Sequence, residues 1–308
     1  MLDQAQIDQF HREGYLIVRN AVPRAAVQAL QDEIEVKIDR QAKILRERGE
    51  ITEMHENADF LHRTALLHSQ STRILDPVAH GTHTGPAIFK LLTCPAILDI
   101  MEQLLGPEIL VSSIYRLRPK LPGLAEGVIP WHQDSAYFHS CADDDLVPTI
   151  WVPLMNATVE TGCMEVLPGC HRKGVIRHYW GDLKAPGLSV HPDHMPDVNP
   201  VPVPADVGDA VMMTNLTPHR STDNVSGLIR WSADLRYSSP EAGDYGPNEA
   251  SFLGRSKDRP DEVVTDWRAF EAIRVNHVPK TKIDRTWLRH DKETFQFPEK
   301  AIGPGPVG

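Results

Sequence analysis

The sequence predicts a mostly β protein, an antiparallel sandwich or barrel with one face covered by a helical N-terminal third. From about residue 109 onward, short runs rich in β-branched and aromatic residues alternate with clusters of turn-forming residues, as is typical of antiparallel sandwiches and barrels. Before that point, apolar residues recur mainly at helical spacing. The 308 residues and 41% hydrophobic content suit one large domain. We predict a single domain over 1–308, with an N-terminal layer at 1–108, a core at 109–240 and a C-terminal extension at 241–308.

The N-terminal layer is predicted to contain helices and one strand. The stretch "DQAQIDQFHREG" reads as a short helix that its final glycine stops, because glycine adopts the left-handed cap conformation easily. "YLIVRNAV" follows as a strand. A long helix is expected from Pro23, which suits a first turn, to Gly49, and another at "CPAILDIMEQLLG". The apolar positions of the long helix are Val27, Leu30, Ile34 and Ile38.

The core is predicted to consist of short strands. They are expected within "ILVSSIYRLRP", "TIWVPLMNAT", "CMEVLP", "DAVMMTN" and "LIRWSADLRY". The segment 182–206 is rich in proline and histidine and has no periodicity, so we expect it to be structureless and to act as a lid or binding loop. The tail at 284–308 is expected to be irregular.

Composition narrows the classes of partner. The net charge of −10 disfavours nucleic acid and anionic membrane surfaces, and mildly disfavours a highly anionic substrate. An apolar run of 18 residues, long enough to span a membrane, is missing. The four cysteines form no CxxC pair, and the polar N-terminus lacks the features of a secretory signal, so we expect a cytoplasmic protein. A small-molecule substrate is the remaining partner, and the oligomeric state stays open.

The stretch "WHQDSAYF" places two metal-binding side chains, His132 and Asp134, two residues apart. On a strand these side chains share a face, because successive residues point to opposite sides. His219 is the best candidate for a third ligand. Two histidines and one carboxylate leave three metal positions open, the arrangement of non-haem Fe(II) oxygenases. Zinc with the same ligands would give a hydrolytic site instead.

An α-keto acid co-substrate needs a cation for its distal carboxylate, and Arg230 is the candidate. It follows His219 by eleven residues, on a predicted strand, and its guanidinium offers a planar fork to a carboxylate. Ser221 could add a hydroxyl donor. Alternation along the strand places Arg230, Ser232, Asp234 and Arg236 on one face. Arg236 is therefore a second inward candidate, for co-substrate or substrate.

Together these segments resemble the phytanoyl-CoA dioxygenase family of Fe(II)/2-oxoglutarate-dependent oxygenases. The resemblance rests on "GYLIVRNAV", "WHQDSAYF", "WVPLMNATVETGCMEVLPGCHRKGV" and "GDAVMMTNLTPHRSTDNVSGLIRWSADLRY", within residues 5 to 240. It implies a double-stranded β-helix, a jelly-roll and cupin-like core with iron at its open end, and Fe(II), 2-oxoglutarate and O2 as cofactors. The chain departs from the family pattern at Cys170, where serine is usual, and at Thr161, where asparagine is common.

The resemblance also implies roles for individual residues. The iron ligands are expected to be His132, Asp134 and His219. Contacts with the co-substrate are expected from Arg230, Ser221, Gln133, Trp151 and Lys120. Related halogenases have alanine or glycine in place of the carboxylate, so its presence here favours hydroxylation, with desaturation, epoxidation or ring formation as related oxidations. Substrate contacts are expected from Tyr137, Phe138, Trp180 and Arg236.

Two other classes of function remain open at this point. One is a cupin-like metal-binding barrel without redox turnover, and the other is a zinc or iron isomerase or hydrolase on the same scaffold. Neither needs 2-oxoglutarate. Arg230 favours the dioxygenase, because a non-enzymatic barrel has no use for a buried guanidinium eleven residues beyond the distal ligand.

Overall fold

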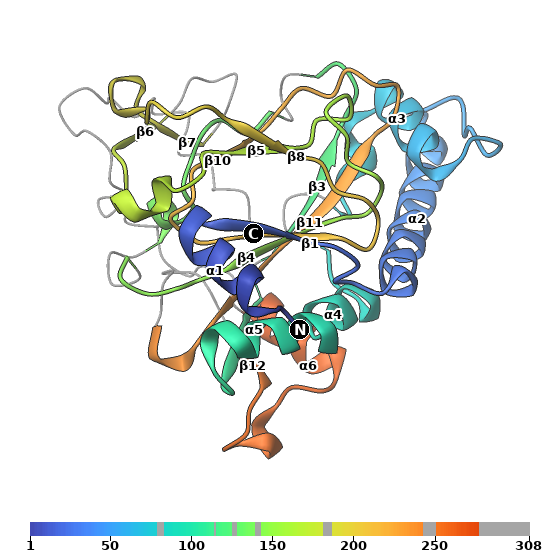
Figure 1. The fold of residues 1–308 in the computed structure, drawn as a ribbon. Coiled ribbons are helices and arrows are strands. Elements are labelled where there is room, and N and C mark those ends of the chain that lie inside the picture. Colours follow the sequence, from blue (N-terminus) through green and yellow to red (C-terminus); the bar gives the residue numbers. More distant parts are fainter. Residues whose placement is uncertain are drawn as a thin grey trace.

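Two antiparallel sheets face one another, and helices cover the outer side of the larger sheet (Figure 1). The computed structural model describes residues 1–78, 83–113, 115–124, 128–138, 143–180, 187–242 and 251–276. Within these residues every strand pairing is antiparallel. The tail that was expected to be irregular, 284–308, lies outside the described residues.

The larger sheet has seven strands. Its order is β1–β9–β4–β11–β2–β12, and β3 also pairs with β11. The strands are β1 (Tyr15–Val18), β2 (Ile109–Ser112), β3 (Arg116–Lys120), β4 (Thr149–Pro153), β9 (Ala210–Met213), β11 (Arg230–Ser238) and β12 (Ser251–Arg255). The central strand, β11, is long enough to pair with β3 at its start and with β2 at its end.

The smaller sheet lies above the larger one in Figure 1 and has the order β10–β5–β8. Its strands are β5 (Met164–Val166), β8 (Val201–Val203) and β10 (His219–Ser221). A separate hairpin pairs β6 (His178–Trp180) with β7 (Leu188–Val190).

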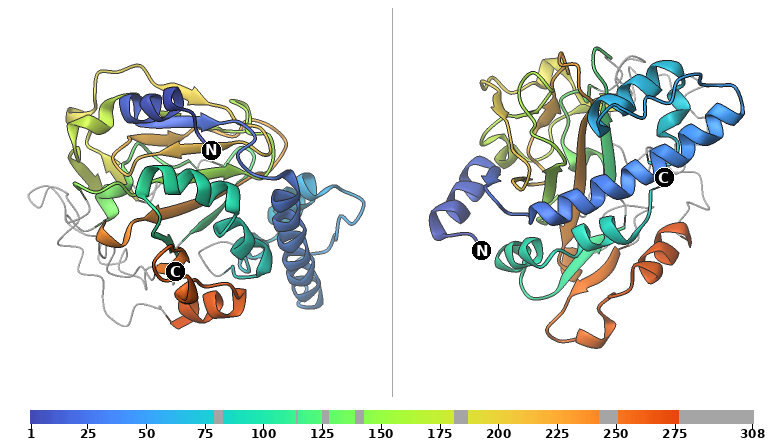
Figure 2. Two further views of the ribbon diagram at one scale, coloured as in Figure 1. Left: turned by 60° about the horizontal axis from the view of Figure 1, so that its bottom comes forward. Right: turned by 90° about the vertical axis from the view of Figure 1, so that its right-hand side faces the viewer.

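Helices cover the opposite side of the large sheet, with α4, α5 and α6 below it in Figure 1 and the long α2 along its edge in both views of Figure 2. The helices of the described residues are α1 (Gln4–Glu13), α2 (Arg24–Glu47), α3 (Phe60–Gln70), α4 (Pro86–Leu92), α5 (Pro95–Leu105) and α6 (Trp267–Asn276). Gly14 ends α1 with φ +80°, as its sequence position predicts.

Strand alternation divides the apolar core into two parts. Outward residues of β11, such as Trp231 and Leu235, pack in one large cluster with the helices. On the inner side, Trp151 and Val211 of the large sheet meet Met164 and Val203 of the small sheet in a second, smaller cluster. The functional site lies next to this inner cluster, between the two sheets.

The structure departs from the sequence prediction in two places. The segment 182–206 is not structureless in its described part, because β7, a short 3₁₀ turn (Pro192–His194) and β8 lie within it. The C-terminal extension continues the fold, since β12 pairs with β2 and α6 packs near α4.

The N-terminal helices α1, α2 and α5 lie where they were expected, whereas α3 and α4 were not predicted. None of the described helices is both long and apolar enough to cross a membrane.

Candidate metal centre

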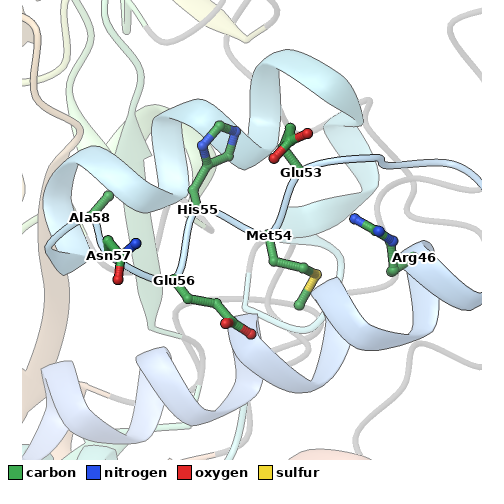
Figure 3. Close-up of a pocket in the computed structure, with 7 residues that line it drawn as sticks. All are labelled: Arg46, Glu53, Met54, His55, Glu56, Asn57 and Ala58. Atoms are coloured by element: carbon green, nitrogen blue, oxygen red, sulfur yellow. The ribbon is translucent and has the colours of Figure 1, made fainter.

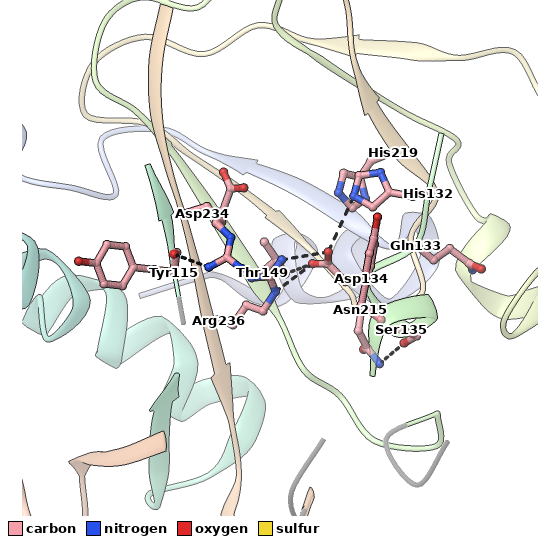
Figure 4. A network of polar contacts seen from close by, with 12 residues as sticks. Tyr115, His132, Gln133, Asp134, Ser135, Thr149, Asn215, His219, Asp234 and Arg236 are labelled. Carbon is pink, nitrogen blue, oxygen red and sulfur yellow. Dashed lines mark hydrogen bonds and ion pairs between the residues drawn. The ribbon is translucent and has the colours of Figure 1, made fainter. Parts of the chain in front are cut away.

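His132, Asp134 and His219 meet between the two sheets (Figure 4). One ligand atom from each residue lies within 4.8 Å of the others, and all three side chains are buried. The two imidazole rings are 4.2 Å apart, and His132 Nε2 is 3.9 Å from Asp134 Oδ1. It is the one set of three or more potential ligands found in the described part of the chain.

Both imidazoles are held in the same tautomer. His132 Nδ1 lies 2.9 Å from the carbonyl oxygen of Pro130, and His219 Nδ1 lies 2.9 Å from that of Thr217. Because a carbonyl oxygen can only accept, each Nδ1 carries the proton and each Nε2 keeps its lone pair for a metal. Burial and the neighbouring His219 lower the pKa of His132 to about 3, so its ring is neutral at physiological pH. The histidines therefore fit a divalent cation.

Backbone hydrogen bonds, rather than a regular strand, bring the ligands together. His132 and His219 form an isolated bridge in which each backbone N–H donates to the other's carbonyl, at 3.0 and 2.9 Å. Gln133 is extended, and Asp134 begins a 3₁₀ helix that ends at Tyr137. The same-face argument thus holds across the extended Gln133, although the predicted strand does not continue past it.

Asp134 is fixed by two further residues, Arg236 and Thr149. The Arg236 guanidinium forms a fork with both carboxylate oxygens, Nη2 to Oδ1 at 3.0 Å and Nε to Oδ2 at 3.3 Å (Figure 4). The Thr149 hydroxyl donates to Oδ2 at 2.6 Å. Burial alone would raise the pKa of Asp134, but the charge of Arg236 and the neighbouring histidines lower it well below its usual range. Asp134 is thus held as a carboxylate.

Arg230 lies deeper between the sheets, with its guanidinium 5.4 Å from the centre of the Trp151 ring. It donates from Nη1 to Ser232 Oγ at 2.7 Å and from Nη2 to the Gly162 carbonyl at 3.1 Å. Its Nε is buried without a hydrogen-bond partner, and no carboxylate of the described residues lies within ion-pair distance. Burial lowers the pKa of Arg230 to about 10. A buried, incompletely bonded guanidinium fits a carboxylate ligand.

Lys120 and Ser221 flank Arg230. In the β3–β11 pairing Lys120 lies directly opposite Arg230, and its ammonium donates to Ser221 Oγ at 2.9 Å. The same hydroxyl accepts from the backbone N–H of Ile129. Burial and the charge of Arg230 lower the pKa of Lys120 to about 7. Four of the five residues predicted for the co-substrate, Arg230, Ser221, Trp151 and Lys120, therefore lie close together.

Gln133 is the exception, and the structure does not bring it into this group. Its side-chain amide donates to the carbonyls of Gly174 and Leu216 and accepts from the backbone N–H of Ile176. Figure 4 shows the side chain directed away from the ligand cluster. Residues on either side of an extended residue point opposite to it, so Gln133 cannot share the face of His132 and Asp134. We remove it from the residues proposed to contact the co-substrate.

The residues predicted to contact the substrate differ in how close they lie to the metal ligands and in what they contact. Tyr137 is 36% exposed, packs edge-on against His132, and accepts a hydrogen bond from the backbone N–H of Leu188. Phe138 is buried with the Arg236 guanidinium 6.0 Å from its ring centre. Arg236 binds Asp134. Trp180 ends β6, and its side chain lies outside the described residues. Tyr137 thus stays a candidate substrate contact beside the metal ligands.

Sequence reasoning missed Thr149, Arg118 and the partner of Arg236. Alternation along β3 would have placed Arg118 on the same inward face as Lys120. In the β3–β11 pairing, Lys120 lies opposite Arg230 and Arg118 lies opposite Ser232. No local pattern marks Thr149, because its role depends on the pairing of Thr149 with Arg236 across β4 and β11.

Two surface hollows lie elsewhere. One, beside the C-terminal end of α2, is drawn in Figure 3, and the other lies between the start of α2 and the loop after β4. The hollow in Figure 3 is lined by Arg46, Glu53, Met54, His55, Glu56, Asn57 and Ala58. Neither hollow contains a member of the ligand cluster, so the chemistry is assigned to the space between the sheets.

Known proteins match both the sequence and the fold. The profile of the family described as Phytanoyl-CoA dioxygenase (PhyH) matches residues 10–232. Phytanoyl-CoA dioxygenase domain-containing protein 1 of Bos taurus is 24% identical over 261 residues, 74% of this chain and 87% of that protein. Ectoine dioxygenase of Bordetella parapertussis is 25% identical over 299 residues, 89% and 85% of the two chains. The epimerase SnoN in complex with Fe3+, alpha ketoglutarate and nogalamycin RO superposes with a TM-score of 0.51 at 21% identity, covering 77% and 83%.

The facing sheets and the buried His-Asp-His set define a cupin-like jelly-roll, the double-stranded β-helix of the non-haem iron oxygenases that depend on 2-oxoglutarate. This fold class agrees with the prediction from the sequence. The chain belongs to the phytanoyl-CoA dioxygenase family. It is a 2-oxoglutarate-dependent dioxygenase whose cofactors are Fe(II), 2-oxoglutarate and O2.

Proposed function

We propose that the protein hydroxylates a small organic molecule, with Fe(II) held by His132, Asp134 and His219 and with conversion of 2-oxoglutarate to succinate and CO2. The proposal rests above all on Arg230, whose guanidinium is buried and whose Nε has no hydrogen-bond partner among the described residues. The same strand, β11, also carries Arg236, which binds the metal ligand Asp134. A barrel that only bound a metal would have no use for this group. Bound iron with 2-oxoglutarate supplies the oxidising chemistry, and the protein supplies position and exclusion of water.

The side chains divide this task between them. Arg230, Lys120 and Ser221 form a cationic and hydroxylic end for the distal carboxylate of 2-oxoglutarate, and Trp151 packs beside it. The keto-acid end then extends along β11 toward Asp134, which β11 also reaches through Arg236. Three metal positions remain for the co-substrate and oxygen, as in other facial-triad sites. Tyr137, beside His132, is proposed to face the substrate.

Hydroxylation is favoured over halogenation because Asp134 keeps its carboxylate among the metal ligands. A hydroxylase transfers one oxygen atom of O2 to the substrate and the other to succinate, so product and succinate form in equal amounts in coupled turnover. Ring formation, desaturation and epoxidation use the same iron site, and the substrate decides among them.

The first test is anaerobic addition of Fe(II) and 2-oxoglutarate to the full-length protein. We expect a weak visible charge-transfer band from chelation of iron by the 2-oxo acid. Arg230→Ala should weaken the affinity for 2-oxoglutarate at least about tenfold, since it removes a charge-assisted, bidentate contact. His219→Ala should abolish the band at any concentration of 2-oxoglutarate.

Oxygen uptake provides the second readout. It should depend strictly on 2-oxoglutarate and yield succinate. A protein that binds iron but gives neither the band nor succinate would instead be a metal-binding barrel or a non-oxidative enzyme. An unchanged 2-oxoglutarate affinity in Arg230→Ala would contradict the assignment of the co-substrate site alone.

A further inference from the structure

The wall formed by β3 and β11 carries more positive than negative side chains. Five cationic residues and one acidic residue lie on the same face of β3 and β11. A second acidic residue contacts this face through Arg236. These residues are Arg116, Arg118, Lys120, Arg230, Arg236, Asp134 and Asp234. Fe(II) and the 2-oxoglutarate dianion cancel each other in charge, so both cofactors together leave this local excess in place. The excess contrasts with the net charge of −10 of the whole chain.

Most of these cations already have a task. Arg236 forms a fork with Asp134, Lys120 donates to Ser221, and Arg230 is proposed to bind the co-substrate. Arg118 differs, because it is bound to Asp234 through Nε alone, at 2.7 Å. Its side chain is 35% exposed, and among the described residues its two terminal nitrogens have no hydrogen-bond acceptor. A guanidinium held by Nε presents its two Nη groups as a fixed fork.

The position of Arg118 is between the two cofactor sites. Directly opposite on β11 is Ser232, which accepts from Arg230. Asp234, the ion-pair partner of Arg118, follows Ser232 by two residues on β11 and is therefore nearer to Arg236 and the metal ligands. A substrate group that reaches Arg118 therefore lies beside iron and 2-oxoglutarate.

Asp234 orients the guanidinium of Arg118, because it accepts a hydrogen bond from Nε. Its side chain is 12% exposed, and one carboxylate oxygen accepts from Arg118. The other, Oδ1, is buried and has no hydrogen-bond partner among the described residues. A buried carboxylate with a free oxygen accepts a donor from a ligand or water. An ion pair that served stability alone would be expected to use the bidentate geometry of Arg236 and Asp134 rather than one nitrogen.

We propose that Arg118, oriented by Asp234, binds a carboxylate of the organic substrate, which places this enzyme among those that act on organic acids. The proposal rests on the proposed function, since it assumes that Arg230 and the metal hold 2-oxoglutarate. It names the chemical class of the substrate and a residue that selects it.

The test uses matched acid and amide probes on the full-length protein, loaded with Co(II) and saturating 2-oxoglutarate under anaerobic conditions. The pairs are phenylacetate with phenylacetamide and hexanoate with hexanamide, and calorimetry measures their binding. We expect at least one acid to bind about tenfold or more tightly than its amide, since a charge-assisted contact is lost in the amide. Arg118→Met should remove this preference.

Arg220 offers a matched control. It also donates through Nε to a carboxylate, that of Glu165 at 2.6 Å, and is 40% exposed, but it lies on β10 in the small sheet. Arg220→Met should keep the preference for the acid. Arg118→Lys, which keeps the charge and loses the fork, should reduce the preference and serves if Arg118→Met fails to fold.

The proposal is overturned if no acid binds more tightly than its amide, or if the preference survives in Arg118→Met. The charge-transfer band with Fe(II) and 2-oxoglutarate is measured on the same proteins. Loss of that band in the unmodified protein would contradict the proposed function, whereas an intact band without acid preference would contradict the role of Arg118 alone.

Discussion

Arg236 has a different task from Arg230, although both arginines lie on the same face of β11. Its fork occupies both oxygens of Asp134, and Thr149 adds a hydroxyl to Oδ2. With Oδ2 engaged twice, Oδ1 is the oxygen that faces His132 and the metal position. Hydrogen bonds of this kind orient metal ligands and tune their affinity. Arg236 is thus a positioning residue for a metal ligand.

Removing this support should weaken metal binding. Thr149→Val and Arg236→Gln are expected to raise the Kd for Mn(II), measured anaerobically by competition with a chelating dye, by about 10- to 100-fold. Ser238, on the same strand but outside the cluster, gives the control Ser238→Ala. An equal or tighter Kd in Arg236→Gln would mean that the guanidinium repels the cation more than it orders the carboxylate.

We expect Lys120 to make 2-oxoglutarate binding dependent on pH. Its pKa is about 7 in the free protein because of burial and Arg230, and a bound carboxylate raises it again, since an opposite charge favours the ammonium. Between these two pKa values the complex holds more protons than the free protein. Binding therefore takes up protons, and the affinity falls as pH rises above about 7.

Calorimetry at pH 8 in buffers of different ionisation enthalpy measures this uptake directly. We expect a value approaching one proton per 2-oxoglutarate bound, and about zero in Lys120→Met. Equal affinities from pH 7 to 9 in the unmodified protein would show that the Lys120 ammonium does not contact the co-substrate.

At the scale of elements, the turn between β4 and β5 contacts the side chains of the proposed co-substrate site. Gly162 has φ +79°, and its carbonyl accepts from Arg230. A Cβ atom there would lie 2.6 Å from Lys120 Cε and 2.7 Å from the Thr222 carbonyl oxygen. The turn thus approaches both cations so closely that only glycine fits.

Gly162→Ala should therefore harm both stability and binding. We expect a loss of about 1 kcal/mol or more in the free energy of unfolding from the left-handed conformation, and a weaker affinity for 2-oxoglutarate. Gly123→Ala is the control, because Gly123 has φ +66° and no atom of the described residues lies within 4 Å of the added Cβ. If both substitutions had the same effect on urea unfolding and on binding, the contact with Lys120 would be unimportant.

Strand periodicity explains how much of this architecture could be predicted. Alternation along "LIRWSADLRY" placed Arg230, Ser232, Asp234 and Arg236 on one face, and the structure has them there. The partner of Arg236 could not be predicted, because Asp134 is 102 residues away and begins a 3₁₀ helix that no local pattern places beside β11. Local pattern likewise missed β8, since the short, proline-containing "VPV" has little strand character without its partner β5.

At the scale of the whole molecule, both cofactors should stabilise the fold. The ligands come from segments 87 residues apart in the sequence (219 − 132), so their geometry exists only in the folded chain. A ligand that binds the native state alone adds about 2.7 kcal/mol of stability at 100 times its Kd. We expect Mn(II) to raise the Tm, and 2-oxoglutarate to raise it further once the metal is bound. Arg230→Ala should keep the increase due to Mn(II) and lose most of that due to 2-oxoglutarate.

The bridge between His132 and His219 has a consequence for how the enzyme matures. These residues are 87 positions apart, and two main-chain hydrogen bonds join them. Because these bonds belong to the backbone, the fold itself brings the two imidazoles together. We therefore expect iron to enter a chain that has already folded, and protein produced without iron to stay able to take up Fe(II) afterwards.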